Sequence, residues 1–384
     1  MIPRRNIRRL FFKALRQPRY ALKVFGKRFL ANMSYYARNG RSSFPESITL
    51  FLTHRCNLHC HMCGQWGDKG VTRSDDSLYI GKELEKEELR GLIDSISSFK
   101  PNITLFGGEP LLYPHCIELI EYIKKKGLHA LMVTNGTMLK EVAGSLVKSG
   151  LDELNVSLDG AGERHDAIRG QQGIFSRIMQ GLAEIQRHKK ERKTTRPLVN
   201  IQCTINSQNY SFLSEMIEVA GQTGADSLTF HHLVFLNKEL IEKQRDCASL
   251  LATDGRAWEG FVFDPGIDPE SLNEEFERIA SLKHAFSVEV YPRFSKDEIL
   301  KYYRNIAEKS FDYGGRCVSP WIVAYIFPDG EVRPCLNFRY SFGNIRTKGF
   351  SEIWNSEEAI RYRSLLRNKK VFPVCLRCTE LYRY

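Results

Sequence analysis

The feature that most constrains the fold is a short apolar run followed by a helical stretch, repeated six times from residue 47 onward. Each run is rich in β-branched or aromatic residues, and it ends in polar residues or glycine. The runs begin at residues 47, 102, 129, 153, 198 and 227. Alternating strands and helices build parallel sheets, so six units predict an α/β fold whose sheet curls into a partial (β/α)6 barrel, with functional residues at the carboxyl ends of the strands.

The composition changes on both sides of this repeat, which predicts four parts. They are a basic helical arm at 1–45, the barrel core at 46–235, a helical bridge or lid at 236–313 and a small α+β domain at 314–384. With 384 residues, of which 42% are hydrophobic, the chain can bury one large core and a smaller one. It has no run of 18 or more apolar residues, which argues against a transmembrane helix.

Three cysteines follow the first predicted strand, at Cys56, Cys60 and Cys63, with C-x3-C-x2-C spacing. A structural zinc site closes with four ligands, usually in C-x2-C pairs. The histidines of the loop that could complete such a site are His54, His59 and His61. Zinc is therefore one alternative. The other is a [4Fe-4S] cluster, in which three thiolates would leave one iron open to an external ligand and hence to chemistry.

A loop of this spacing after the first strand resembles that of the radical S-adenosylmethionine (SAM) superfamily. The resemblance covers roughly residues 45 to 235. It implies a [4Fe-4S] cluster on Cys56, Cys60 and Cys63 whose open iron binds the amino and carboxylate groups of SAM. An electron from the cluster then cleaves the sulfonium to a 5′-deoxyadenosyl radical, which takes hydrogen from the substrate.

The segment "FGGEP" at the end of the second predicted strand resembles the GGEP motif of this family. The motif implies that Gly107, Gly108 and Glu109 meet the amino group of SAM. Two glycines allow the close approach of a backbone, and a carboxylate can face an ammonium group.

Further SAM contacts follow from the ends of later strands. "TNGT" provides Asn135, "NVSLDG" provides Ser157, and "HDAIRG" places Arg169 like the arginine that pairs with the SAM carboxylate. Met62 holds a position that is often aromatic and contacts adenine. Methionine departs from that preference but keeps an apolar surface.

A second cysteine set lies near the carboxyl terminus. Cys317, Gly330 and Cys335 have C-x12-G-x4-C spacing, and Cys375 and Cys378 form a C-x2-C pair. The set resembles the SPASM/twitch extension of radical SAM enzymes. A complete SPASM domain has seven cysteines and two auxiliary clusters, so four cysteines imply the twitch-like form with one auxiliary [4Fe-4S] cluster. Such a cluster has every iron bound by a thiolate, which suits electron transfer; a zinc tetrahedron is the alternative.

Three other cysteines, Cys116, Cys203 and Cys247, are isolated in the sequence. They have no partner at the spacing of a metal site, so we expect them to be small buried hydrophobic residues.

A radical domain with a fully ligated auxiliary cluster implies that the substrate radical loses an electron, which amounts to an oxidation. We expect a sugar, a lipid-linked compound or another small anionic substrate, and a reducing partner such as flavodoxin or ferredoxin. The alternative is a peptide maturase, although 45 residues before the first strand are few for a peptide-recognition domain. Epimerisation or radical coupling would use the same machinery.

The sixth strand ends in His231 and His232, and His231 is the candidate base for the proton that an oxidised alcohol releases. Packing of the histidine at the strand end is the alternative. Glu289 and Arg293 are further candidates for the substrate pocket.

The arm carries the excess positive charge of the chain. Residues 1–41 contain twelve Lys or Arg and no Asp or Glu, and without these twelve the other 44 basic residues face 45 acidic ones. Two short helices are predicted, one with Ile7, Leu10, Phe11 and Ala14 on a single face and one that begins at Pro18. The second has an apolar stripe made of Leu22, Phe25, Phe29, Met33 and Tyr36.

Apolar residues among Arg and Lys favour either a peripheral contact with an anionic membrane or packing of the stripe on the body. The segment "RRLFFK" is similar to an export signal, but charged residues interrupt the apolar region that would have to follow. We therefore expect a cytoplasmic protein whose arm can lie peripherally on the inner face of the membrane. Binding of nucleic acid by an RNA-modifying enzyme is less favoured, because no nucleic-acid-binding domain follows the arm, and a zinc scaffold would leave "FGGEP" and Arg169 without a role.

Overall fold

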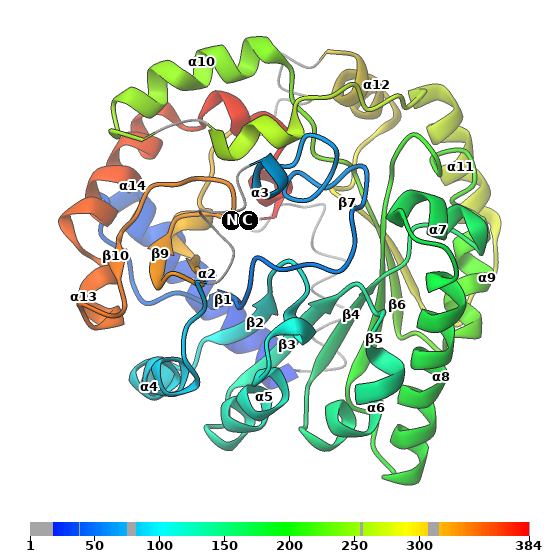
Figure 1. Ribbon diagram of the computed structural model, residues 1–384. Coiled ribbons are helices and arrows are strands. Elements are labelled where there is room, and N and C mark those ends of the chain that lie inside the picture. The colour runs from blue at the N-terminus through cyan, green and yellow to red at the C-terminus, as the bar shows by residue number, and fades with distance from the viewer. Residues whose placement is uncertain (1–17, 38, 75–81, 254–255, 306–314, 384) are drawn as a thin grey trace.

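The computed structural model describes residues 18–37, 39–74, 82–253, 256–305 and 315–383. Its centre is one ten-stranded sheet in the order β10-β9-β8-β1-β2-β3-β4-β5-β6-β7 (Figure 1). The strands are β1 (Ser47–Phe51), β2 (Asn102–Phe106), β3 (His129–Thr134), β4 (Glu153–Ser157), β5 (Leu198–Thr204), β6 (Ser227–His231), β7 (Ser287–Tyr291), β8 (Val323–Ile326), β9 (Glu331–Arg333) and β10 (Gly343–Asn344). The six predicted strands are present, and they pair in parallel as neighbours.

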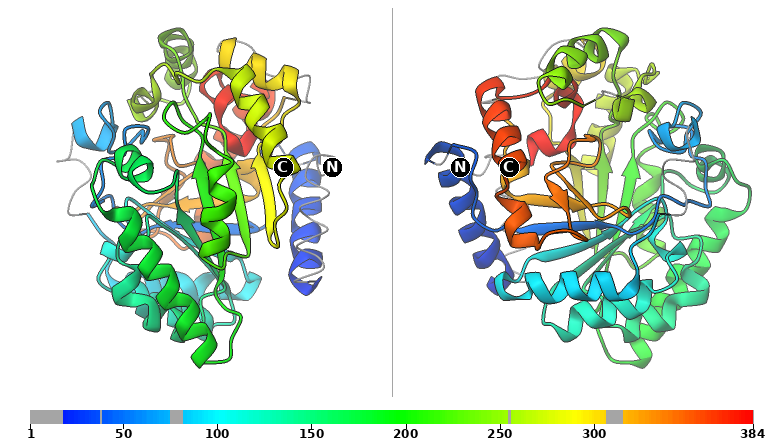
Figure 2. Two further views of the ribbon diagram at one scale, coloured as in Figure 1. Left: turned by 90° about the vertical axis from the view of Figure 1, so that its right-hand side faces the viewer. Right: turned by 60° about the vertical axis from the view of Figure 1, so that its left-hand side comes forward.

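Helices cover the outer face of this curled sheet (Figures 1 and 2). The helices of the described residues, of which α4, α5, α6 and α8 lie on that outer face, are α2 (Pro18–Ala37), α3 (Val71–Ser74), α4 (Lys86–Ile96), α5 (Cys116–Lys125), α6 (Leu139–Lys148), α7 (Glu163–Arg169), α8 (Ile174–Glu191), α9 (Glu215–Gln222), α10 (Lys238–Ser249), α11 (Pro269–Ser281), α12 (Lys296–Arg304), α13 (Phe350–Trp354) and α14 (Glu357–Lys369). Alternate strand residues such as Val199, Ile201 and Cys203 are fully buried, and those between them are half-buried. The fold is thus a partial, unclosed α/β barrel, as predicted.

The sheet extends further than six units on both sides. β7 lies inside the segment expected to be a helical bridge, and it pairs in parallel with β6. β8, from the carboxyl-terminal region, pairs in parallel with β1. The reason in both cases is that the outer strands of a partial barrel have unpaired backbone groups, which a further strand satisfies.

Helix α2 begins at Pro18, as the sequence predicts, but it faces the body with a side other than the predicted stripe. Val24, Ala31 and Tyr35 are buried, whereas all five residues of the stripe are more than half exposed. Lys27 Nζ donates to Phe99 O at 2.7 Å, and Arg28 Nε lies 2.7 Å from Glu46 Oε2. Packing of α2 on the body is therefore present, but not through the stripe. The first predicted helix of the arm lies outside the described residues.

Arg363 of α14 joins three segments that are distant in the sequence. It is fully buried, and its guanidinium donates to Pro320 O at 2.8 Å, Trp354 O at 2.8 Å and Gly40 O at 3.3 Å. The guanidinium carbon also lies 4.1 Å from the centre of the Trp354 ring. The residue thus connects the end of the arm, the start of β8 and α13.

We predict that Arg363→Ala lowers the free energy of unfolding by about 3 kcal/mol, because it leaves buried carbonyl groups without donors. Denaturant unfolding checks this. The control is Arg361→Ala on the same helix, an exposed side chain that donates to Leu250 O; it should cost about 0.5 kcal/mol. Equal losses in the two variants would contradict the role given to Arg363.

Candidate functional site

The three-cysteine loop leaves the carboxyl end of β1 and is held there by the turn after β2. Gly108 N donates to Thr53 O at 2.8 Å, and Glu109 N donates to Arg55 O at 2.9 Å. A Cβ atom at Gly107 would lie 2.7 Å from Thr53 O, and one at Gly108 would lie 2.2 Å from Arg55 O. Only glycine allows this approach to the cysteine loop. The predicted contact of the pair with the amino group of SAM stays a prediction.

The carboxylate of Glu109 is fully buried and joins the ends of β2 and β3. It accepts hydrogen bonds from Leu111 N at 3.1 Å, Thr134 Oγ1 at 2.8 Å and Asn135 N at 2.7 Å. Burial raises the pKa of Glu109 to about 7, although these hydrogen bonds oppose the shift. In this geometry the Glu109 carboxylate connects the turn after β2 to the end of β3. This role is additional to the SAM contact that the motif implies.

Asn135 connects the end of β3 to the cysteine loop. Its Nδ2 donates to Asn57 Oδ1 at 2.8 Å, and Asn57 Nδ2 donates to Thr137 Oγ1 at 2.8 Å. Sequence reasoning named Asn135 but missed Asn57 and Thr137. One sequence feature could have indicated this contact. Asn57 directly follows Cys56, and the end of β3 carries the amide of Asn135 and the hydroxyl of Thr137.

Arg169, at the end of α7, lies between a buried carboxylate and a cysteine. Its Nη2 is 2.6 Å from Asp159 Oδ2, and its Nη1 is 3.6 Å from Cys60 Sγ. Asp159 is fully buried two residues after Ser157, at the end of β4. The guanidinium is therefore already fixed beside the cysteine loop, where it can face an anionic group. Asp159 is a further residue that sequence reasoning missed.

The three cysteines of the loop pack around the same small apolar cluster. Burial raises the pKa of Cys56 to about 12, and the charges of Cys60 and Cys63 contribute. Met62 packs against the apolar cluster around Leu58 and Cys60. Trp66, which sequence reasoning did not single out, closes the loop, since its Nε1 donates to His54 O at 2.7 Å and its backbone N lies 3.4 Å from Cys63 Sγ.

The second cysteine set also converges. Burial raises the pKa of Cys317 well above its usual value, and the charges of the other three thiols add to this, so all four lie within electrostatic reach. Burial likewise raises the pKa of Tyr362 on α14, and the same four thiols are the further causes. The four thiols come from the segments around η6 (Ser319–Trp321), β9 and η7 (Pro373–Arg377), which the fold brings close enough for their charges to interact. The donor set fits a fully thiolate-bound cluster.

The isolated cysteines and the two strand-end histidines have separate surroundings. Cys116 and Cys203 are buried as predicted, and Cys247 is half-buried on α10. His232 is buried among aromatic rings with Nδ1 2.8 Å from Tyr303 Oη, and burial lowers its pKa to about 3. It is a packing residue. His231 is half-buried, and its Nε2 contacts Gln202 Oε1 on β5.

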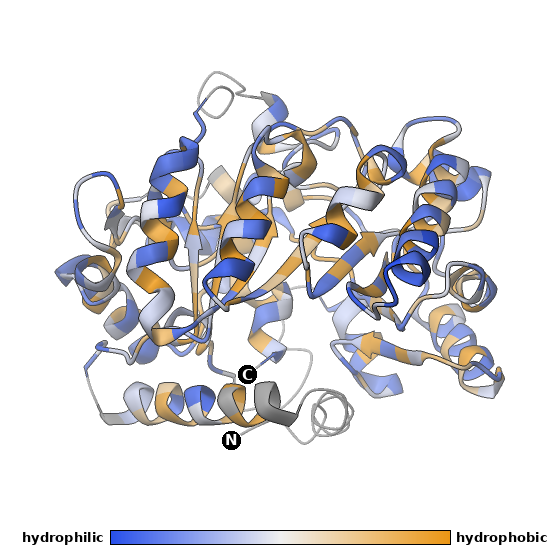
Figure 3. Cartoon of the chain, turned by 90° about the horizontal axis from the view of Figure 1, so that it is seen from below, coloured by the Kyte–Doolittle hydropathy of each residue, from blue (hydrophilic) through white to orange (hydrophobic). Residues whose placement is uncertain are grey.

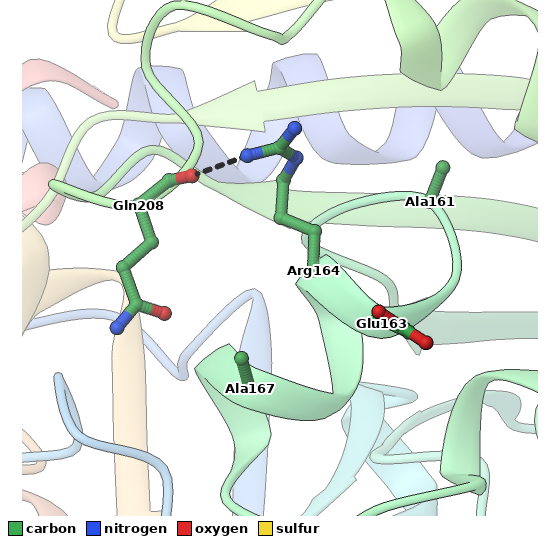
Figure 4. A pocket seen from close by; sticks show the side chains of 5 residues that line it. All are labelled: Ala161, Glu163, Arg164, Ala167 and Gln208. Atoms are coloured by element: carbon green, nitrogen blue, oxygen red, sulfur yellow. Dashed lines mark hydrogen bonds between the residues drawn. The ribbon is translucent and has the colours of Figure 1, made fainter.

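A shallow hollow of about 560 Å³ opens at the same end of the strands, next to α7. Figure 4 shows Arg164 reaching across it, with Nη1 3.2 Å from Gln208 O. Its lining residues are Ala161, Glu163, Arg164, Ala167 and Gln208. The hollow lies beside the residues that the sequence assigns to SAM, since Arg169 ends the same helix.

Two family models match the chain. The radical SAM superfamily model matches residues 50–202, and the iron-sulfur cluster-binding SPASM domain model matches residues 317–379. The chain belongs to the radical SAM superfamily. Its cofactors are accordingly SAM with a [4Fe-4S] cluster in the barrel, and an auxiliary iron-sulfur cluster in the SPASM domain.

Relatives and solved structures agree with this assignment. The chain is 29% identical over 351 residues to Fe-coproporphyrin III synthase of Methanosarcina barkeri, which covers 86% of this chain and 79% of that protein. It is 25% identical over 326 residues to the subtilosin biosynthesis protein AlbA of Bacillus subtilis, with 83% and 62% covered. The crystal structure of SuiB from Streptococcus suis has a TM-score of 0.59 at 13% identity and covers 83% of this chain and 68% of its own, which shows a shared fold.

Among the described residues, no three His, Cys, Asp or Glu side chains gather at the spacing of a single metal ion. The family match, which names an iron-sulfur cluster for each cysteine region, decides against the zinc alternative.

We predict that the reconstituted protein holds about eight irons, and that Cys56→Ala/Cys60→Ala/Cys63→Ala lowers this to about four and abolishes SAM cleavage under dithionite. Cys375→Ala/Cys378→Ala should also leave about four irons but should still form 5′-deoxyadenosine. Iron and sulfide analysis and chromatography of the nucleoside measure both. Cys247→Ala is the control and should change neither; stoichiometric zinc without SAM cleavage would contradict the assignment.

We also predict that Glu109 makes the stability of the apoprotein fall as the pH rises. Its folded pKa of about 7 lies above the unfolded value, so the folded state binds more protons between pH 5 and 7. The loss from pH 5 to 8 should be about 2–3 kcal/mol. Unfolding of the wild type and of Glu109→Gln across this range measures the difference, and identical pH profiles would contradict the shift.

Proposed function

We propose that this radical SAM enzyme oxidises a neutral, hydroxyl-rich substrate, such as a sugar, bound inside the barrel. In this proposal Cys56, Cys60 and Cys63 hold the SAM-binding cluster, and the four cysteines of the SPASM domain hold the auxiliary one. SAM contacts are assigned to Met62, Gly107, Gly108, Glu109, Asn135, Ser157 and Arg169. The observation that carries the substrate class is a polar wall on β4 to β7.

The polar wall consists of half-buried side chains on adjacent strands that hydrogen-bond to one another. Asn200 Nδ2 donates to Asn155 Oδ1 at 2.9 Å, and Ser227 Oγ donates to Asn200 Oδ1 at 2.7 Å. Gln202 and His231 form the next pair toward the carboxyl ends. The residues that alternate with them on β4, β5 and β6 are buried and apolar, so the wall is the inner face of the sheet. They are Leu154, Val156, Val199, Ile201, Cys203, Leu228 and Phe230.

The wall has hydrogen-bonding groups but no cations. Strands β1 to β7 contain no Lys or Arg, and the charged residues of β4 to β7, apart from any charge on His231, are the carboxylates Glu153 and Glu289. Amide and hydroxyl side chains match the donors and acceptors of neutral hydroxyl groups. An anionic substrate would find no Lys or Arg side chain on these strands. Helix α2 of the basic arm, from which an anionic substrate was expected, packs beside the amino ends of β1 and β2.

The wall begins at the proposed SAM residues. Ser157 on β4 is in register with Gln202 on β5, and Thr204 on β5 is in register with His231 on β6. A substrate held by Gln202 and His231 would therefore lie next to SAM bound at Ser157. Proximity of this kind is what hydrogen transfer requires.

When bound, SAM and its cluster supply a 5′-deoxyadenosyl radical, and the auxiliary cluster supplies an acceptor for the electron that an oxidised substrate loses. The chain supplies orientation and a base. Gln202 Oε1 accepts from His231 Nε2, which fixes the orientation of the imidazole ring. His231 can then receive the hydroxyl proton as the alcohol becomes a carbonyl group.

Peptide modification is the second candidate, and the similarity to AlbA supports it. Backbone amides would also find partners on a wall of Asn and Gln side chains. The reductant in either case would be a one-electron carrier such as flavodoxin or ferredoxin. We also place the protein in the cytoplasm, in peripheral contact with the membrane through its basic arm.

We predict that neutral polyols and glycans raise the anaerobic formation of 5′-deoxyadenosine, whereas carboxylated tetrapyrroles and short peptides do not. A carbon-deuterated form of the active compound should transfer deuterium into 5′-deoxyadenosine. Mass spectrometry of the nucleoside measures both. Stimulation by peptides alone would favour the second candidate.

His231→Asn should separate hydrogen abstraction by the radical from the later removal of the hydroxyl proton. It should keep deuterium transfer but lower the formation of the carbonyl product about 100-fold, because only the proton acceptor is removed. Gln202→Leu is the companion variant, which keeps the imidazole but removes the oxygen that orients it. An unchanged product yield in His231→Asn would contradict the assigned base.

A further inference from the structure

Helix α2 carries most of the large apolar side chains that the described part of the protein exposes. Ten such side chains are exposed, and six of them lie on this helix. They are Leu22 (75% exposed), Phe25 (54%), Phe29 (58%), Leu30 (53%), Met33 (51%) and Tyr36 (55%), together called the α2 stripe. Single exposed apolar residues are ordinary, whereas a contiguous patch of this kind marks an interaction surface.

The stripe cannot turn inward, because the opposite side of α2 is fixed to the body. Val24, Ala31 and Tyr35 are buried there, and Tyr35 packs edge-on against Trp321 with ring centres 4.9 Å apart. Lys27 and Arg28 hold the same side through the contacts with Phe99 and Glu46. Figure 3 shows α2 along one side of the molecule, with hydrophobic residues recurring along its length.

The segment that contains the stripe is basic in sequence, and two arginines from other segments contact the end of α2. Residues 1–41 have twelve Lys or Arg and no acidic residue. At the carboxyl end of α2, the guanidinium carbon of Arg316 lies 4.8 Å from the centre of the Tyr36 ring, and Arg367 Nη2 donates to Tyr36 O at 3.2 Å. An apolar helical stripe in a segment without carboxylates, with Arg316 and Arg367 at its carboxyl end, complements an anionic lipid surface.

We propose that the α2 stripe docks the protein on an anionic lipid bilayer, with its apolar side chains in the headgroup region. A second copy of the chain is a poorer occupant, because two arms with twelve cations each would repel one another. The bilayer supplies both the apolar layer and the negative charge that this surface lacks.

The placement of α2 fixes how the docked enzyme is oriented. Lys27 contacts the backbone oxygens of Pro45 and Phe99, which precede β1 and β2, whereas the cysteine loop follows the carboxyl end of β1. Figure 2 accordingly shows α2 and α3, the short helix after that loop, on opposite sides of the molecule. The docked enzyme therefore opens its SAM site away from the bilayer, and its substrate arrives from the aqueous side.

Vesicle flotation of the full reconstituted chain tests this proposal without SAM or substrate, so its failure would leave the proposed chemistry untouched. The wild type should float with vesicles that contain phosphatidylglycerol and much less with pure phosphatidylcholine. Phe25→Ser/Phe29→Ser should weaken the binding at least about tenfold, because two exposed apolar side chains no longer enter the interface. Its iron content and thermal midpoint should match those of the wild type.

Leu250→Ser/Leu282→Ser is the matched control, since both residues are exposed apolar side chains outside α2. It should float like the wild type. Equal binding by the stripe variant and the wild type would overturn the proposal. So would a dimer in sedimentation that the stripe variant dissociates, or binding that appears only after residues 1–17 are removed, because the stripe would then be covered by a second copy or by this segment.

Discussion

The candidate site depends on the close approach of two backbones at the carboxyl ends of β1 and β2. The turn at Gly107 and Gly108 lies so near the start of the cysteine loop that a Cβ atom would collide with Thr53 O or Arg55 O. Two backbone hydrogen bonds from this turn hold the loop, and the buried Glu109 carboxylate extends the connection to β3. A loop with three cysteines is thereby supported on rigid strand ends, which is the condition for binding a cluster and SAM in a fixed orientation.

Charge is arranged around this support in a way that suits both cofactors. Arg169 lies between Asp159 and Cys60, so one guanidinium balances a buried carboxylate and a sulfur ligand position at once. Thiols hold a cluster as thiolates, and burial raises their pKa values in its absence, so cluster binding and proton release are coupled at both cysteine sets. One continuous sheet connects the regions of the two cysteine sets, because β8 of the carboxyl-terminal region pairs with β1 of the barrel.

The inner face of the barrel is divided between two kinds of surface. Phe51 and Phe106 lie on β1 and β2, with ring centres 5.6 Å apart, while Asn155, Asn200 and Gln202 lie on the strands opposite. In the proposed function, the polar strands would bind the hydroxyl groups of the substrate. The α2 stripe is remote from this face, so the proposed membrane contact and the proposed substrate class rest on separate parts of the molecule.

The sequence alone determined the six core strands, the family and both cysteine sets, because strand periodicity and ligand spacing are local patterns that survive without the fold. The paired glycines at positions 107 and 108 also indicated a close backbone approach, since such an approach excludes residues with a Cβ atom. Only the tertiary structure decided that α2 buries Val24 and Tyr35 and exposes the predicted stripe, because either side of the helix is apolar enough to pack. It likewise brought Asn57, Asp159 and Trp66 into contact with the site, because the partners of these side chains are not determined by their own sequence positions. The pairing of β7 and β8 with the barrel strands was also decided by the fold, because strand pairing joins segments that are distant in the sequence.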